Sequence, residues 1–270
     1  MKSLIKEHVF LLAVFSILLV TCVNAGDSNP PNGVDNPIQH ERQNQPKPQP
    51  IDTAYYTRLL LGKVQYRNDT SFVLVSPKHS SKQIYLEKST YKAFRLMYGA
   101  AKADGVHLLI ISGARNFDYQ KRIWERKWNA RPNSCSKIEK AKGTLMFSAM
   151  PSTSRHHWGT DFDLNSLENS YFDSGRGLAE YKWLCQNAHR FGFCQVYTNK
   201  QQTGRTGYEM EKWHWSYMPL ASQYLRLYAQ LISNNDISGF PGCELAHELN
   251  VINDYVFGVS NCQGVKLSVE

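Results

Sequence analysis

Apolar residues recur at helical and strand spacing along the middle of the 270-residue chain, and they predict its first elements. Over residues 89–103 they follow the period of an amphipathic helix, and Gly105 stands just past its end. The apolar run 106–111 predicts a strand, and a helical pattern of aromatic and aliphatic residues predicts a second helix over 117–128. The polar stretch 130–153 that follows predicts a long loop.

The second half of the chain continues this mixture of short strands and helices. Residues 159–164 suit a strand, 178–190 a helix closed by Gly192, and 193–197 a short strand. We expect the last strand over 208–217, followed by a helix over 219–233 with Pro219 in its first turn. Because helices and strands alternate without a regular βαβ rhythm, the pattern predicts an α+β fold.

The first fifty residues have a different character from the rest. Residues 1–25 resemble a secretory signal, with Lys2 and Lys6 before an apolar stretch too short to span a bilayer and a small-residue ending at Ala25. Lipoprotein processing at Cys22 is the alternative. Residues 26–50 hold six of the eleven prolines and predict an extended linker. We therefore expect an exported protein that meets a membrane only through its signal peptide or a lipid anchor.

The remaining chain is long enough for one domain with a substantial core, expected over residues 51–235. Residues 236–270 would then form a C-terminal extension held by a disulfide. Five cysteines remain after either processing route, and the shortest pairings are Cys185 with Cys194 and Cys243 with Cys262, which leaves Cys135 unpaired.

Two short segments carry candidate chemistry: residues 154–163 read SRHHWGTDFD, and residues 211–215 read EKWHW. Catalytic Zn²⁺ takes three protein ligands from histidine nitrogen and carboxylate oxygen, and keeps a further position open for water. His156, Asp163 and His214 would supply such a set. Glu211, three residues before the last ligand, is placed like the general base of such a site.

These segments resemble the signatures S-x-H-x-x-G-x-A-x-D and E-x-W-H of the LAS peptidases, and specifically of the VanY-like D-alanyl-D-alanine carboxypeptidases. One position departs from the pattern, because Asp161 stands where the family has a small residue. On a strand, Asp161 and Asp163 would face the same side. Alignment with the motif favours Asp163 as the ligand and gives Asp161 a hydrogen-bonding role around it.

A third segment, residues 112–120 (SGARNFDYQ), is similar to the family element S-G-Y-R-S-x-x-x-Q. It would deliver Arg115 to the edge of the cleft, where its guanidinium could bind the substrate carboxylate or the developing oxyanion. Gln120 and Ser154 would assist in substrate binding, and Trp215 is a candidate cleft wall, with core packing as the alternative. His157 would be a substrate-side donor or a surface residue.

The resemblance implies a small antiparallel sheet with packed helices and a zinc site in a cleft, the LAS or hedgehog-type peptidase fold. It implies a Zn²⁺-dependent enzyme that trims the terminal D-alanine from peptidoglycan stem peptides. An L,D-carboxypeptidase, an endopeptidase and a non-catalytic zinc-stabilised wall-binding module remain as alternatives, although Glu211 and Arg115 favour an enzyme. Glu211 and His214 would face opposite sides of a straight strand, so the backbone must turn between them.

The net charge of +8 agrees with a partner that carries negative charge. A basic exported domain suits an anionic cell envelope. Nucleic acid is not expected as a partner, because no recognition motif accompanies the scattered lysines and arginines.

Overall fold

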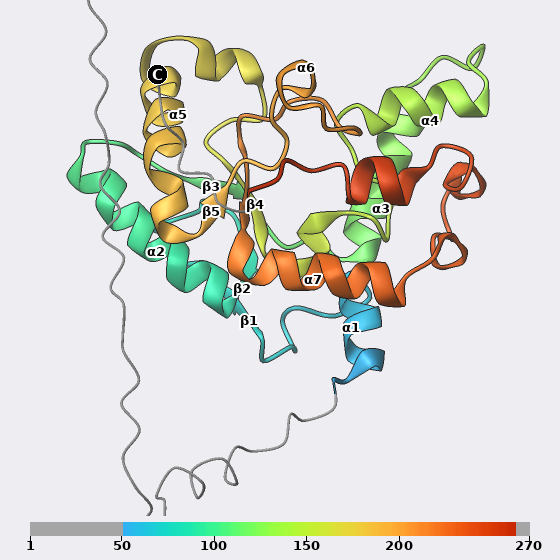
Figure 1. Ribbon diagram of the computed structural model, residues 1–270, viewed down its shortest axis with the longest axis horizontal. Helices are drawn as coiled ribbons and strands as arrows, with labels where there is room; N and C mark the ends of the chain where they lie inside the picture. The colour runs from blue at the N-terminus through green and yellow to red at the C-terminus, as the bar shows by residue number, and fades with distance from the viewer. Residues whose placement is uncertain (1–50, 263–270) are drawn as a thin grey trace, which may run out of the picture. The chain divides into compact units, whose positions relative to one another are not determined.

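A computed structural model describes residues 51–262 (Figure 1). The sequence predictions for residues 1–50, including the signal, the linker and Cys22, lie outside this range, as do residues 263–270. The described elements are, in chain order, α1 (Thr53–Leu60), β1 (Phe72–Leu74), β2 (Tyr85–Glu87), α2 (Lys88–Ala103), β3 (Ile110–Ser112), α3 (Phe117–Asn129), α4 (Lys137–Leu145), β4 (Asp161–Leu164), α5 (Gly175–Asn187), β5 (Phe193–Cys194), α6 (Lys200–Thr203), β6 (His214–Tyr217) and α7 (Met218–Leu231).

A four-stranded antiparallel sheet with the strand order β3-β4-β6-β5 forms the centre, and β1 and β2 make a separate hairpin-like pair. Helices pack around these short strands (Figure 1). The α+β class and the small antiparallel sheet predicted from the sequence are therefore confirmed.

Three clusters of buried side chains hold the elements together. The first lies between the sheet, α2 and α5 and includes Phe94, Phe162 and Trp215. The second joins α3 and α4 to the residues after α7, and the third joins α1 and α7 around Trp158. Because Ile237, Phe240, Ala246 and Val251 belong to the second cluster, residues 236–262 share a core with the elements before them.

Several predicted boundaries were wrong for identifiable reasons. The expected loop over 130–153 contains α4, whose first turn is closed by a capping box between Ser136 and Glu139. The last strand begins at His214 rather than near residue 208, because a turn precedes it. The two long helices α2 and α3, and the left-handed Gly192 after α5, lie where the pattern placed them.

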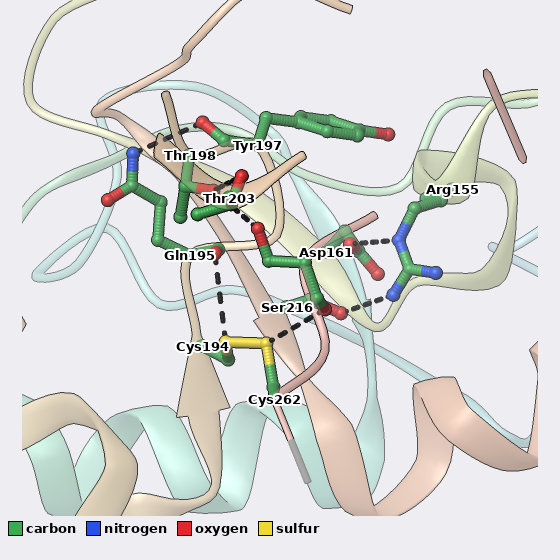
Figure 2. Close-up of a disulfide and its surroundings, with 10 residues drawn as sticks. Arg155, Asp161, Cys194, Gln195, Tyr197, Thr198, Thr203, Ser216 and Cys262 are labelled. Atoms are coloured by element: carbon green, nitrogen blue, oxygen red, sulfur yellow. Dashed lines mark hydrogen bonds and ion pairs between the residues drawn. A yellow bond between two sulfur atoms is a disulfide. The ribbon is translucent and has the colours of Figure 1, made fainter. Parts of the chain in front are cut away.

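The cysteine pairing expected from the shortest loops was also wrong. Cys194 on β5 is bonded to Cys262, while Cys135, Cys185 and Cys243 are free thiols (Figure 2). The chain returns to β5 after residue 256, and the Ser260 amide donates to the Val196 carbonyl at 2.9 Å. This contact brings together two cysteines separated by 68 residues, which no rule based on spacing predicts.

Candidate active site

The three predicted ligands meet on one side of the central sheet. His156 lies in a single turn of 3-10 helix (Arg155–Trp158), Asp163 on β4 and His214 at the start of β6. Asp163 and His214 are direct cross-strand partners, so the pairing of β4 with β6 sets their separation. Asp163 Oδ1 lies 3.4 Å from His156 Nε2 and 3.2 Å from His214 Nδ1, and all three side chains are buried.

Each histidine uses its second ring nitrogen in a contact outside this triad. His156 Nδ1 lies 2.8 Å from the Gly113 carbonyl oxygen, and since a carbonyl only accepts, Nδ1 carries a proton. His214 Nε2 lies 3.1 Å from the Asp161 carboxylate. These contacts orient the rings so that His156 Nε2 and His214 Nδ1 face Asp163, which is how metal-ligating histidines are commonly fixed.

The donor set fits a cation such as Zn²⁺. Asp163 Oδ1 is buried and accepts no hydrogen bond from any residue that the structure describes, although burying a carboxylate oxygen without one is costly. A tetrahedral ion with bonds of about 2.0–2.1 Å separates its ligand atoms by roughly 3.3–3.4 Å, close to the separations found here. His156, Asp163 and His214 therefore form a candidate metal site within the part of the chain that the structure describes.

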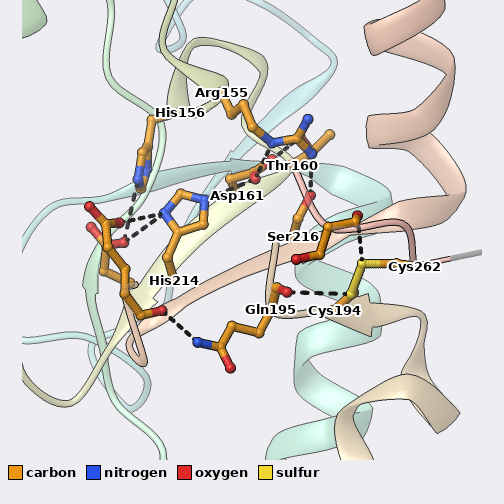
Figure 3. Close-up of polar contacts among 12 residues, drawn as sticks. Arg155, His156, Thr160, Asp161, Cys194, Gln195, His214, Ser216 and Cys262 are labelled. Atoms are coloured by element: carbon orange, nitrogen blue, oxygen red, sulfur yellow. Dashed lines mark hydrogen bonds and ion pairs between the residues drawn. A yellow bond between two sulfur atoms is a disulfide. The ribbon is translucent and has the colours of Figure 1, made fainter. Parts of the chain in front are cut away.

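Asp161 contacts the His214 ring on the side away from Asp163. This contact agrees with the hydrogen-bonding role that the sequence motif suggested for Asp161. Its Oδ1 accepts from Arg155 Nε at 2.9 Å and faces His214, while Thr160 Oγ1 donates to Oδ2 at 2.6 Å (Figure 3). Arg155 also donates to Ser216 Oγ at 2.6 Å. Burial alone would raise the pKa of Asp161, but the Arg155 charge, the His214 ring and the Thr160 hydroxyl together outweigh burial and hold this pKa below its usual range. Asp161 is thus an ionised acceptor for the His214 ring.

Glu211 lies beside the triad because the chain turns just before β6. The His214 amide donates to the Glu211 carbonyl at 3.3 Å, and this turn brings Glu211 Oε2 to 3.6 Å from His214 Nδ1. The predicted turn of the backbone between Glu211 and His214 is therefore present. The Glu211 amide donates to the Tyr197 carbonyl at 3.0 Å, and Gln195 Nε2 donates to the Glu211 carbonyl at 3.1 Å. Burial raises the pKa of Glu211 to about 7, a suitable value for a general base.

Arg115 is held by its backbone and leaves its side chain free in the site. Its amide donates to the His156 carbonyl at 3.1 Å, and its carbonyl accepts from His157 Nδ1 at 2.6 Å. Its Nε is buried and has no hydrogen-bond partner among the described residues. The guanidinium is therefore available for an anionic group of a substrate.

The prediction for His157 as a substrate-side donor or surface residue was wrong. The ring is fully buried, and its Nε2 accepts from the Ser152 amide at 3.1 Å. Burial lowers its pKa to about 3, so the ring is neutral. Gly62, at φ +74°, packs directly on it, and a Cβ there would lie 2.4 Å from His157 Nδ1. His157 thus fixes the backbone of Arg115 rather than meeting a substrate.

A cavity of about 480 Å³ opens over the triad and Glu211. Arg115, Gln120 and Ser154 line it, so these predicted residues do lie at the site. Gln120 Nε2 donates to the Ala149 carbonyl at 2.8 Å, and its Oε1 has no hydrogen-bond partner within residues 51–262. Trp215 does not line this cavity, and its suggested role as a cleft wall is corrected. Its ring points to the other face of β6, into the core shared with α2, because neighbours on a strand alternate.

Sequence reasoning missed several residues that line the cavity. Phe147 and Leu167 are 42% and 52% exposed, and Trp213 lies with its ring centroid 6.5 Å from that of Phe147. Lys127 on α3 lines the same cavity. The i, i+3, i+7 spacing of Gln120, Ile123 and Lys127 on a predicted helix could have indicated them, once Gln120 was assigned to the site.

These features together define a metallopeptidase-type site. Two buried histidines and a carboxylate can hold a metal ion, and a glutamate base and an unpaired arginine lie beside them on a small antiparallel sheet. Residues 83–220 match the family model VanY, described as D-alanyl-D-alanine carboxypeptidase. The chain belongs to this family, as the sequence motifs indicated.

Individual relatives match part of their length. YodJ of Bacillus subtilis (strain 168) is 30% identical over 156 residues, which cover 57% of this chain and 52% of that protein. A D-alanyl-D-alanine carboxypeptidase of Enterococcus faecalis (strain ATCC 700802 / V583) is 31% identical over 125 residues, covering 45% and 44%. The match thus spans about half the length of these relatives.

Among solved structures, VanYB in complex with D-alanine-D-alanine is similar at 24% identity, covering 62% of this chain and 91% of that chain, with a TM-score of 0.46. The LD-carboxypeptidase LdcB is similar at 24% identity, covering 64% and 81%, with a TM-score of 0.47. Over residues 51–262, no helix combines the length and the apolar character needed to cross a membrane.

Proposed function

We propose that this protein is a Zn²⁺-dependent D-alanyl-D-alanine carboxypeptidase that removes the terminal D-alanine from peptidoglycan stem peptides. Membership of the VanY family supports this proposal. The observation that carries it is the convergence of the ligand triad, Glu211 and the unpaired Arg115 on one cavity. A module that only binds cell wall has no use for a base and a free guanidinium beside a metal site.

Each residue has a role in this proposal that follows from its contacts. His156, Asp163 and His214 would hold the cation, which when bound supplies Lewis-acid chemistry by acidifying water and polarising the peptide carbonyl. Glu211 would accept the proton of the attacking water and pass it to the leaving amine of D-alanine. Arg115 would bind the negative charge that the substrate carries or develops. Gln120 and Ser154 would hold the peptide backbone from the cavity wall.

The proposal includes action outside the cytoplasmic membrane, on finished peptidoglycan. Stem peptides of peptidoglycan are reached there, and the signal-like residues 1–25 agree with export. A basic protein is also attracted to an anionic envelope, which raises its local concentration at the wall.

The deciding experiment measures release of free D-alanine from a UDP-MurNAc-pentapeptide and from the matching tetrapeptide. Release from the pentapeptide alone, lost on chelation and restored by Zn²⁺, is the expected result. Glu211→Gln should lower the rate by about 10²–10⁴-fold while leaving the fold and Zn²⁺ binding in place. Release from the tetrapeptide alone would instead establish L,D specificity, and release from neither would refute the carboxypeptidase.

A further inference from the structure

One face of α2 carries a line of cations that has no role in the mechanism above. Four cations and a glycine follow one another at spacings of four, three, four and three residues, which places them along one side of the helix: Lys88, Lys92, Arg95, Gly99 and Lys102. All five are exposed. This line, the α2 stripe, is about 21 Å long at the rise of an α-helix.

The acidic residues nearest in the sequence do not neutralise the α2 stripe. Within residues 51–262, none of its four cations forms an ion pair. Residues 75–103 contain six lysines and arginines and a single acidic residue, Glu87. Glu87 is buried, and its carboxylate accepts from the Thr90 amide at 2.9 Å. Asp104, just past the helix, accepts from Trp183 Nε1 at 2.7 Å.

The charge spacing on α2 is unfavourable in the protein alone. Lys92 has a cation four residues before it and another three residues after it, and like charges at these spacings on a helix repel. Other helices place opposite charges at the same distance. Lys121 pairs with Glu125 on α3, and Arg176 pairs with Glu180 on α5. An anionic partner that binds along the α2 stripe would relieve this repulsion.

The basic surface continues from the α2 stripe onto the loop between β1 and β2. Lys78 Nζ lies 5.7 Å from the centroid of the Tyr98 ring on α2. Burial lowers the pKa of the His79 ring, and the charges of Lys78 and Arg95 lower it further, so both cations lie near this ring. The loop thus widens the stripe at its middle.

The α2 stripe faces away from the candidate active site. Asp163 and His214 alternate along β4 and β6 with Phe162 and Trp215, which belong to the core shared with α2. The ring centroids of Phe162 and Phe94 on α2 are 5.3 Å apart. Because neighbours on a strand point to opposite faces, α2 and the triad lie on opposite sides of the sheet. A partner on the stripe therefore leaves the cavity open.

The form of the α2 stripe indicates the class of partner. Its cations stand about 5–10 Å apart along the helix axis, which suits a linear chain with one phosphate in each repeat. Binding in a bilayer surface needs apolar side chains beside the cations. Among the large apolar residues of α2, Leu96 alone is exposed.

We propose that the α2 stripe binds a linear polyanion with a phosphodiester in each repeat, and that this contact holds the protein at an anionic cell envelope with its cavity free. The inference goes beyond the proposed function, because the stripe and the cavity are separate and binding needs no peptidase reaction.

The test measures binding of fluorescently labelled poly(glycerol phosphate) to the full chain by anisotropy. Affinity should fall by about tenfold or more when salt rises from about 0.02 M to about 0.2 M, because ions screen exposed charges. Lys92→Gln combined with Arg95→Gln should weaken binding by about tenfold at low salt, the scale of two exposed ion pairs. Lys140→Gln combined with Lys142→Gln removes the same charge from α4 and should bind like the unmodified protein.

Gly99 allows a second test that keeps every cation. A Cβ at this position meets no atom within 4 Å, and both glutamate and glutamine favour a helix more than glycine does. Gly99→Glu would place a carboxylate beside Arg95 and Lys102 and should lower the affinity by about tenfold. Gly99→Gln has the same size without the charge and should bind within about twofold of the unmodified protein.

Three results would overturn the inference. They are no salt-sensitive binding by the unmodified protein, an equal loss in the α4 control, and tighter binding to phosphatidylglycerol vesicles than to the polymer at equal phosphate concentration. D-alanine release is then measured with saturating polymer, and unchanged release is expected. Inhibition by the polymer would refute a free cavity. Absence of any D-alanine release would refute the proposed function and leave the binding results intact.

Discussion

Asp161→Ala would give this chain the small residue that the family motif has at that position, and we expect it to weaken the site instead of improving it. The change removes the carboxylate that faces His214 Nε2 at 3.1 Å and accepts from Arg155 Nε at 2.9 Å. Two separate losses follow, because Asp161 orients a proposed ligand and also neutralises a buried cation.

The two losses have different sizes. Removing the outer hydrogen-bond partner of a metal-binding histidine typically costs 10–100-fold in metal affinity, which is about 1.4–2.7 kcal/mol. Arg155 and Asp161 are 1% and 0% exposed, so Arg155 would be left buried without its counter-ion. Breaking a buried pair in this way costs about 3–5 kcal/mol of folding stability.

A double variant separates the two effects. Arg155→Met with Asp161→Ala removes both charges together, and replacing a buried pair by apolar residues is often close to neutral for stability. Urea unfolding should therefore show a large loss in the single variant and a much smaller loss in the double variant. Competition for Zn²⁺ against a chromophoric chelator should show the 10–100-fold loss in both.

The Zn²⁺ affinity and the stability of the double variant test the two roles of Asp161 separately. If the double variant binds Zn²⁺ as tightly as the unmodified protein, Asp161 does not position His214, and its contact with the ring has no effect on the site. If the double variant is as unstable as the single one, the stability loss does not come from the unpaired Arg155.

Further predictions concern protons, the unpaired arginine and the disulfide. Burial opposes protonation of His214, but the two adjoining carboxylates of Asp161 and Asp163 raise its pKa to about 9. Zn²⁺ binding at pH 8 should therefore release a proton and weaken as the pH falls; calorimetry in buffers of different ionisation heat checks this, and identical heats would contradict it. Glu211 must be ionised to act as a base, so kcat/KM should fall as the pH drops through the Glu211 pKa. A bound cation moves this pKa below about 7. If the fall of kcat/KM at low pH persists unchanged in Glu211→Gln, another group causes it. Arg115→Met should lower kcat/KM by about 10²–10³-fold in the D-alanine release assay, and a loss under twofold would exclude a role in binding substrate charge. Cys262→Ser should lower the free energy of unfolding by about 2–4 kcal/mol in urea titrations without changing Zn²⁺ affinity, whereas a loss of affinity would show that the bond to Cys194 shapes the site.

The ligand triad was open to prediction because its members sit in short motifs with fixed spacing. His156, Asp163 and His214 follow from residue type and order, and the structure brings them to one place, with Glu211 beside them. The long helices were predictable for a similar reason, since their amphipathic period repeats over three or more turns. Ligand motifs and amphipathic periods that lie within a short stretch of sequence can be recognised without knowing the fold.

The rest depends on contacts between distant parts of the chain. The Cys194–Cys262 bond joins residues 68 apart, and the shortest-loop rule chose other pairs. Trp215 and His157 looked like site residues because they adjoin motif positions, but strand alternation and burial turn them away from the cavity. Position next to a motif residue says little about which way a side chain points.

The packing of Gly62 on His157 places a limit on how much of this protein can be removed. The match to the family covers residues 83–220 and omits both Gly62 and Tyr228, whose hydroxyl donates to the Ser152 carbonyl at 3.0 Å. Gly62, just after α1, and Tyr228 on α7 thus brace the segment around His156 and His157 from outside the residues that the family model matches. The family match therefore marks where the proposed catalytic motifs lie but does not mark the smallest piece that folds: a protein cut to 83–220 would keep every proposed ligand and lose the Gly62 and Tyr228 contacts that hold the segment around His156 in place.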